Sequence, residues 1–203
     1  MNFTLAPPLA FMFATEGWGH ERTGRLHAGF DLRAAVGTPA LAAHAGTVVY
    51  AGPYSDTTGL TVELDRGDGL MTRYLHLSSL AVTKGQRVAT GAVLGRTGHA
   101  TSPHLHFDCW VLPQHLPLYA VRHGTPKGGF AFKQTFRGVQ WVKVPMEPIV
   151  PSTYQADVLS KAQEFGLAPF KGGLAGKKSI LVLAALLGGA GFLGYRFYKT
   201  LPA

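Results

Sequence analysis

The chain has 203 residues, of which 46% are hydrophobic, 26 are glycine and 13 are proline. This length and composition exclude an intrinsically disordered protein, allow one domain with an appendage, and favour a turn-rich β domain over a helical bundle. The formal net charge of +8 divides equally between residues 1–150 and residues 151–203, but no dense Lys/Arg run with interleaved aromatic residues is present, so we expect no nucleic-acid partner.

The N-terminal stretch, MNFTLAPPLAFMFATEGWGH, is apolar, but it has no basic region and contains a Pro-Pro pair. We therefore expect no signal peptide here. The next stretch, GRLHAGFDLRAAVGTPALAA, contains His27 and Asp31. These residues are four positions apart, so on an extended segment their side chains face the same way. An imidazole nitrogen and a carboxylate oxygen are both donors that zinc accepts.

Short alternating runs broken by glycine follow from about Thr38 to Trp110. They predict strands of four to seven residues in an antiparallel sheet, with the clearest hairpin turn at DRGDG, Asp65–Gly69. The runs are GTVVYAG, GLTVELDRGDG, LMTRYLHLSSL, RVATGAVLGRTG and HLHFDCWV. The predicted fold class is therefore mainly β.

The run SPHLHFDCW sets two histidines inside an otherwise apolar strand. Side chains two positions apart share one face of a strand, so His104, His106 and Asp108 project together. The intervening side chains project the other way and form part of the predicted core. Cys109 is among them, and as the single cysteine it excludes an internal disulfide.

Residues 111–150 contain three further runs, YAVRH, GFAFKQTF and GVQWVKV. We expect them to extend the sheet or form another hairpin, so that a catalytic β domain over residues 1–120 is followed by a β extension over residues 121–150. PMEPIVPSTY is a proline-rich exit into a linker over residues 151–176. In this linker QADVLSKAQEF predicts a short helix that stops at Gly166.

The last segment differs in kind, because Ser179–Tyr195 contains seventeen residues without a charge. A membrane span needs about 20 apolar residues, with about 17 as the lower limit. Basic and aromatic residues flank the segment, as expected at two membrane interfaces. Its four glycines would destabilise a water-soluble helix but are common in membrane helices. We therefore expect residues 177–199 to form a C-terminal transmembrane α-helix rather than a buried core helix.

The histidines and the aspartate combine into one chemical hypothesis. His27, Asp31 and His106 would make a three-ligand zinc site with a fourth position open for water, which is the catalytic arrangement. His76, in RYLHLSSL, and His104 remain as imidazoles that could take a proton from the attacking water or stabilise the oxyanion. A lone His-x-x-x-Asp or His-x-His motif is weak, and the order of the motifs along the chain gives them weight.

In that order, the motifs resemble the lysostaphin-type zinc metalloendopeptidases, which cut peptide cross-links or stems in bacterial cell walls. The resemblance runs from HAGFDLRAAVGTPALAAHAGTVVYAG through GLMTRYLHLSSLAVTKGQRVATGAVLGRTG to SPHLHFD, about half of the chain. It implies an antiparallel β-sheet or roll with zinc in a groove walled by loops. It also implies one zinc ion per chain on His27, Asp31 and His106, with His76 and His104 as the catalytic histidines in an order that the sequence does not decide.

The chain departs from the family pattern at three positions. Asp108 stands where a glutamate commonly follows HLHF, so a role behind the metal ligands is expected from a shorter carboxylate. Ser102 replaces a usual glycine, and Arg66 replaces a histidine often seen before the hairpin glycine. Two further residues are candidates for the groove: His99, in the turn before the His-x-His motif, and Tyr74, which should share a strand face with the histidine two positions on.

The predicted function is zinc-dependent hydrolysis of peptide bonds in bacterial peptidoglycan. The alternative is a catalytically inactive family member that acts as a membrane-bound structural or cell-wall-binding protein. A lipoyl- or biotinyl-type carrier is a third possibility, since VTKGQRVATGAVLG also fits its strand–turn–strand, but Lys84 does not lie at a hairpin tip.

The expected partners are peptidoglycan and a lipid membrane. A wall peptidase without an export signal would meet its substrate if it were carried by a virus particle, so a phage virion component acting in host entry or lysis is one expected setting. Basic residues at both ends of the span leave its orientation undetermined. The sequence does not indicate an oligomeric state.

Overall fold

A computed structural model describes residues 1–10, 12, 14–136 and 138–145. The described part is mainly β, and its only α-helix is short. The strands are β1 (Ala14–Glu16), β2 (Glu21–Arg22), β3 (Arg25–Leu26), β4 (Phe30–Arg33), β5 (Pro39–Leu41), β6 (Gly46–Ser55), β7 (Gly59–Asp65), β8 (Leu70–Leu80), β9 (Arg87–Val88), β10 (Val93–His99), β11 (Pro103–Val111), β12 (Lys133–Phe136) and β13 (Val139–Val144). The helices are a 3-10 turn, Pro113–His115, and α1, Leu116–His123.

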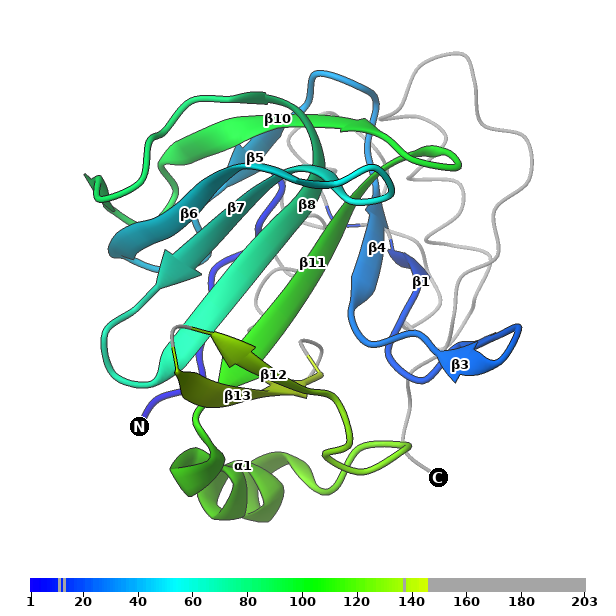
Figure 1. Ribbon diagram of the computed structural model, residues 1–203, viewed down its shortest axis with the longest axis vertical. Helices are drawn as coiled ribbons and strands as arrows, with labels where there is room; N and C mark the ends of the chain where they lie inside the picture. Colours follow the sequence, from blue (N-terminus) through cyan, green and yellow to red (C-terminus); the bar gives the residue numbers. More distant parts are fainter. Residues whose placement is uncertain (11, 13, 137, 146–203) are drawn as a thin grey trace, which may run out of the picture. The chain divides into compact units, whose positions relative to one another are not determined.

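Strand β11 lies at the centre of the arrangement that matters for the site (Figure 1). It pairs with β4 along one edge and with β8 along the other, both antiparallel, and it meets the end of β10 at its beginning. The sheet continues from β8 through β7 and β6 to β9. The expectation of a mainly β, antiparallel fold is confirmed.

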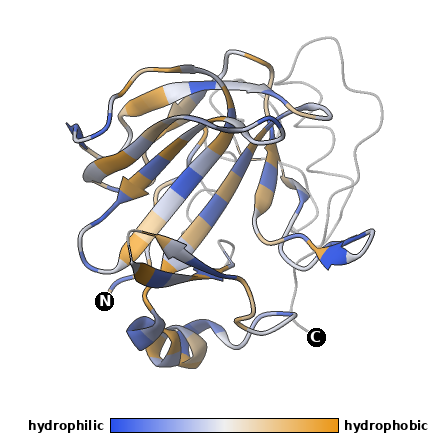
Figure 2. Cartoon of the chain, in the orientation of Figure 1, coloured by the Kyte–Doolittle hydropathy of each residue, from blue (hydrophilic) through white to orange (hydrophobic). Residues whose placement is uncertain are grey.

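The core face predicted for β11 is confirmed, although the opposite face is also covered, since His104 and Asp108 are buried too. Leu105, Phe107 and Cys109 are fully buried in the main hydrophobic cluster. Burial also raises the pKa of the Cys109 thiol, so this cysteine is a small hydrophobic residue and not a reactive group. Figure 2 shows the corresponding bands of hydrophobic and hydrophilic residues along β8 and β11.

The hairpin predicted at Asp65–Gly69 joins β7 to β8. Gly67 and Gly69 both have φ of 91°, a left-handed conformation that only glycine adopts without strain. β7 and β10 have seven residues each, within the expected length of four to seven, whereas β6, β8 and β11 are longer, with ten, eleven and nine residues. The predicted run GTVVYAG ends at Gly52, but β6 continues through this glycine to Ser55.

The run YAVRH is an α-helix, which corrects the expectation of a strand over this part of the chain. It forms the second half of α1, which has a proline in its first turn and ends at Gly124, with φ of 78°. These are helix start and stop signals. The other two runs form the expected hairpin, β12 with β13, and β13 extends the sheet by pairing with β11.

No helix in the described ranges is long and apolar enough to cross a membrane. The transmembrane helix expected at residues 177–199 and the short helix expected in the linker lie outside those ranges.

Candidate metal centre

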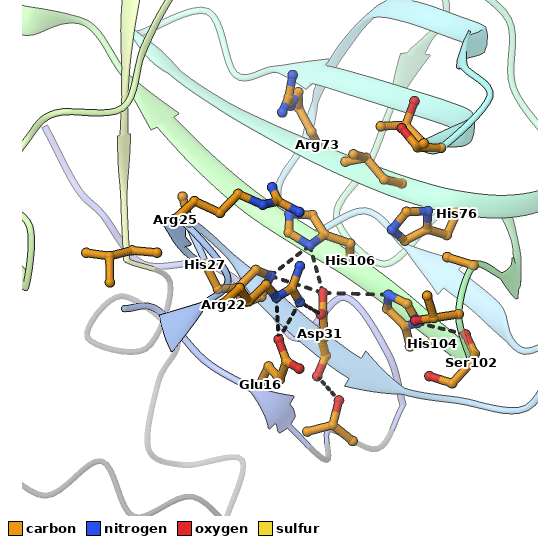
Figure 3. A pocket seen from close by; sticks show the side chains of 18 of the residues that line it. Glu16, Arg22, Arg25, His27, Asp31, Arg73, His76, Ser102, His104 and His106 are labelled. Carbon is orange, nitrogen blue, oxygen red and sulfur yellow. Dashed lines mark hydrogen bonds and ion pairs between the residues drawn. The ribbon is translucent and has the colours of Figure 1, made fainter. Parts of the chain in front are cut away.

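A groove of about 1020 Å³ opens on the face of the sheet where β4, β8 and β11 meet. All five residues that the sequence predicted as ligands or catalytic histidines line it: His27, Asp31, His76, His104 and His106. Figure 3 shows these side chains converging from strands that are far apart in the sequence.

Three side-chain atoms meet at one point of the groove. His27 Nε2 lies 3.1 Å from His106 Nδ1 and 3.2 Å from Asp31 Oδ1, and the last two atoms are 2.7 Å apart. The strand register explains the meeting, because His106 is directly opposite Asp31 in the β4–β11 pair, and opposite residues share a face. His27 comes from the segment just before β4.

The other ring nitrogen of each histidine is committed elsewhere. The Gly17 carbonyl, which can only accept, lies 3.1 Å from His27 Nδ1, so the hydrogen is on Nδ1 and the Nε2 lone pair faces the groove. In His106, Nε2 lies 3.4 Å from Asp108 Oδ2, so Nδ1 is the nitrogen that faces the groove.

This donor set fits zinc. Two imidazoles whose outer nitrogens each face an oxygen atom of the protein, together with one carboxylate, are ligands that zinc accepts. Ligand atoms at zinc distances of about 2.0–2.2 Å would be roughly 3.3 Å apart around a tetrahedral ion. The separations between the three atoms, 2.7 to 3.2 Å, are near that value. Among the described residues, this is the group of His, Asp and Glu side chains that could hold a metal.

Asp31 is held as an anion. Burial alone would raise its pKa, but the contacts of its Oδ1 with the rings of His106 and His27 keep the pKa far below its usual value. Its second oxygen, Oδ2, accepts a hydrogen bond from Arg22, which also binds Glu16. Sequence reasoning missed Arg22 and Glu16, because they lie before the recognisable motifs. Glu16 reaches the site through the pairing of β1 with β4, and Arg22 extends to Asp31 from the β2–β3 hairpin.

His76 and His104 lie beside the three-atom cluster. Their ring centroids are 4.8 Å apart, and His104 Nε2 is 3.6 Å from Asp31 Oδ1. The His104 Nδ1–H donates to the Ser102 carbonyl at 2.8 Å, so its Nε2 carries the free lone pair. Burial, reinforced by the charges of His104 and His106, lowers the pKa of His76 to about 4. At neutral pH His76 is therefore an uncharged imidazole.

Tyr74 is not in the groove, which corrects the expectation that it shares a face with His76. The His76 backbone has φ of 61°, and the register of β8 shifts at this point against both β7 and β10. The shift reverses the alternation, so Leu75 and His76 both line the groove. Tyr74 is fully buried, and its hydroxyl accepts a hydrogen bond from the Ala43 N–H at 2.7 Å. His99 is exposed at the end of β10 and is not among the residues that line the groove.

Asp108 lies directly behind His106 in a cluster of buried charges. Arg73 binds it through two hydrogen bonds of 3.0 Å each, as expected from the opposite positions of the two residues in the β8–β11 pair. Lys143 Nζ is 2.7 Å from Oδ2. Burial alone would raise the pKa of Asp108, but the charges of Arg73 and Lys143 hold it well below its usual range. Glu63 lies 3.7 Å from Arg73 and completes the cluster.

The chain is similar to known proteins over the part that contains the groove. A sequence model described as Peptidase family M23 matches residues 25–118, a range that contains all five groove residues named above. Over 147 residues the chain is 32% identical to the peptidoglycan DD-endopeptidase ShyA of Vibrio cholerae, an alignment covering 68% of this chain and 28% of ShyA. The chain spans less than a third of the length of the curated relatives it matches.

Two solved structures are also similar. The catalytic domain of lysostaphin from Staphylococcus simulans is 33% identical, with a TM-score of 0.46, over 49% of this chain and 80% of that domain. A zinc containing peptidase from Vibrio cholerae is 32% identical, with a TM-score of 0.45, over 53% of this chain and 36% of that protein. The family resemblance expected from the sequence motifs is confirmed by the match over residues 25–118.

Proposed function

The chain belongs to peptidase family M23, and from that premise we propose that it is a zinc-dependent endopeptidase that hydrolyses peptide bonds of bacterial peptidoglycan. The observation that carries this proposal is the meeting of His27 Nε2, Asp31 Oδ1 and His106 Nδ1 within 3.2 Å of one another. These atoms would hold the metal. When bound, zinc would supply a Lewis acid at the point where they meet.

His76 and His104 would accept and donate the protons that move during hydrolysis. Hydrolysis adds water across the amide: the oxygen of water joins the carbonyl carbon, the C–N bond breaks, and one proton must reach the departing nitrogen. His104 offers Nε2 as a proton acceptor, because its Nδ1–H is bonded to a carbonyl. His76, uncharged at neutral pH, can accept or stabilise a proton on the same side of the groove.

The composition of the groove favours a peptide that carries a free carboxylate. Most cations of its lining are bonded to groups of the protein, as Arg22 is to Asp31 and Arg73 is to Asp108. Arg25 also lines the groove, is exposed, and makes no side-chain hydrogen bond or ion pair with the described part of the chain. A guanidinium in this state suits a substrate carboxylate.

The role of Arg25 can be measured separately from the chemistry. Arg25→Gln should raise KM for carboxylate-bearing wall peptides by about tenfold, with kcat unchanged, because one charge-assisted hydrogen bond contributes about 1.5 kcal/mol or more. Arg87→Gln, on β9 and outside the groove lining, is the matched control. Equal KM values for the two variants would exclude Arg25 from binding.

The experiment for the function is a digestion of purified cell wall. The full chain with zinc should release new amino groups and no new reducing sugars, since glycan hydrolysis ordinarily uses two free carboxyl groups, whereas Glu16 and Asp31 of the groove lining are both bound by Arg22. His106→Ala should release neither. New reducing ends without new amines would contradict the proposal. No release by the zinc-loaded chain would favour the alternative, an inactive relative that binds the wall.

We further propose that residues 177–199 anchor the enzyme in a membrane. The support is the uncharged stretch of the sequence with basic and aromatic residues on both sides. The full chain should partition with detergent, and a chain ending at Gly176 should remain in the aqueous phase. Equal partitioning of the two would refute the anchor.

A further inference from the structure

Lys143 occupies an unusual position for a lysine. It lies on β13, and only 13% of its side chain is exposed. The ammonium Nζ is 2.7 Å from Asp108 Oδ2, donates to the Ala28 carbonyl at 3.1 Å, and lies 5.0 Å from the centre of the Trp110 ring. Lysine is rarely buried unless it is paired, so each of these contacts compensates a substantial loss of hydration.

The two oxygen atoms that Lys143 contacts belong to neighbours of two metal-ligand candidates. Ala28 follows His27 directly in the chain. Asp108 lies 3.4 Å from Nε2 of His106. The lysine, which also lines the groove, therefore connects the segment that carries one imidazole with the strand that carries the other. Such outer contacts fix the orientation of metal ligands.

Neutralising Asp108 does not by itself require Lys143. Arg73 already binds both carboxylate oxygens of Asp108 with good geometry. The contact that Arg73 does not make is the one to the Ala28 carbonyl. What Lys143 adds is thus a connection between two segments, in addition to a charge.

The space around this connection is tight. A Cβ atom added to Gly29, the residue after Ala28, would lie 2.7 Å from His106 Nε2 and 3.0 Å from the Phe107 carbonyl oxygen. The backbone after His27 therefore packs directly against the ring of the second ligand. A shift of the Ala28–Gly29 backbone would change the distance between the two imidazoles.

We propose that Lys143 is a positioning residue of the metal centre, holding His27 and His106 at ligand spacing by bridging the Ala28 carbonyl and Asp108. This inference rests on the proposed zinc site. Lys143 lies beyond residues 25–118, so the hairpin β12–β13 is a working part of the centre and not only an extension of the sheet.

The test compares zinc affinity among variants of the full chain, measured by competition with a chelator at a temperature where each metal-free variant is folded. Lys143→Met keeps the length and apolar contact of the side chain but removes its charge and donors, and should weaken zinc binding by about 10-fold or more. Lys143→Arg keeps both charge and donors and should restore most of the affinity. Lys133→Met, on the same hairpin but exposed, is the control and should bind zinc like the wild type.

The outcomes separate positioning from simple stability. A folded Lys143→Met variant with wild-type zinc affinity would overturn the inference while leaving the proposed function intact, and so would equal losses in Lys143→Met and Lys143→Arg. A wild-type chain that binds no zinc would overturn both. If Lys143→Met does not fold, Lys143→Gln is measured instead; its uncharged side chain is one bond shorter and does not span both the Ala28 carbonyl and Asp108, so wild-type affinity there contradicts the bridge.

Discussion

The two edges of the His106 ring face two kinds of polar cluster. At the Nδ1 edge, His27 and Asp31 bring lone pairs together. At the Nε2 edge, Asp108 meets two cations of the protein itself, Arg73 and Lys143. The second cluster is internally neutral, since Asp108 and Glu63 balance the two cations. The difference is what the proposed zinc site requires: the protein supplies its own cations at the Nε2 edge, whereas at the Nδ1 edge it gathers donors that a metal cation would bind.

Exchanging one carboxylate on each edge is the strongest way to break this comparison. Asp31→Asn should lose zinc and reduce wall hydrolysis to background, with a far smaller effect on the unfolding of the metal-free chain. Asp108→Asn should lower the free energy of unfolding by about 3–5 kcal/mol, because it leaves Arg73 and Lys143 with an uncompensated buried charge. Zinc titration and chemical denaturation measure both. Equal losses of zinc and of stability in the two variants would remove the distinction.

Removing the two free imidazoles tests whether the Nδ1 side does more than bind metal. His76→Ala and His104→Ala should each keep one zinc per chain and lower turnover by about 10²–10⁴-fold, the usual contribution of a positioned acid or base. Metal content and turnover are measured on the same preparation. Loss of zinc in either variant would make that histidine a ligand instead.

Gly29→Ala tests the Nε2 edge of His106 without replacing any titratable residue. The new Cβ would press on the Nε2 edge of His106, so we expect a loss of about 1–3 kcal/mol in unfolding free energy, together with weaker zinc binding. Gly52→Ala, whose Cβ would meet nothing closer than 3.4 Å, is the control. Thermal unfolding and chelator competition give the two readings. A Gly29→Ala chain that resembles its control in both would show that the ring has room to move.

The smallest expected effect concerns the stability contributed by His44, a histidine outside the groove whose two ring nitrogens both have partners within the protein. Its Nδ1 is 2.9 Å from the Ala45 carbonyl and its Nε2 is 3.0 Å from the Thr72 hydroxyl. Burial lowers the pKa of His44, so below about pH 6.5 the unfolded chain takes up a proton more readily than the folded one. Its contribution to stability is therefore present at neutral pH and decreases as the pH falls below that value. Unfolding midpoints of metal-free wild type and His44→Gln between pH 7.5 and 5 should converge on acidification, and a constant difference would contradict this.

Alternation along a strand was enough to predict one side of the site but not the other. On β11 the pattern is regular, and the register with β4 places His106 opposite Asp31, so the meeting of these two side chains could be predicted from the motifs. On β8 the left-handed backbone of His76 reverses the pattern, and the prediction for Tyr74 failed for that reason. A histidine tolerates a left-handed backbone better than a β-branched residue does, but the residues around His76 in the sequence do not predict this conformation.

Other parts of the site depend on contacts that no local pattern contains. Arg22 and Lys143 reach it from hairpins outside the motifs, and their roles follow only from distances in the folded chain. The helix α1 was missed although its signals were present. A proline in its first turn and Gly124 after its end mark a helix, but a five-residue apolar run is too short for its period to decide between helix and strand.

The order of pairing also has a consequence in time. His27 and Asp31 leave the ribosome early, and β4 can pair with β1 at once, but the strand that carries His106, β11, arrives about seventy residues later, and Lys143 follows after another thirty-five or so. Because non-local strand pairing must precede the coming together of the donors, an incomplete chain has no assembled site and cannot hold zinc strongly. Under the proposed function, metal capture would thus be tied to the last steps of domain synthesis, and the centre would stay inactive until the domain around it is complete.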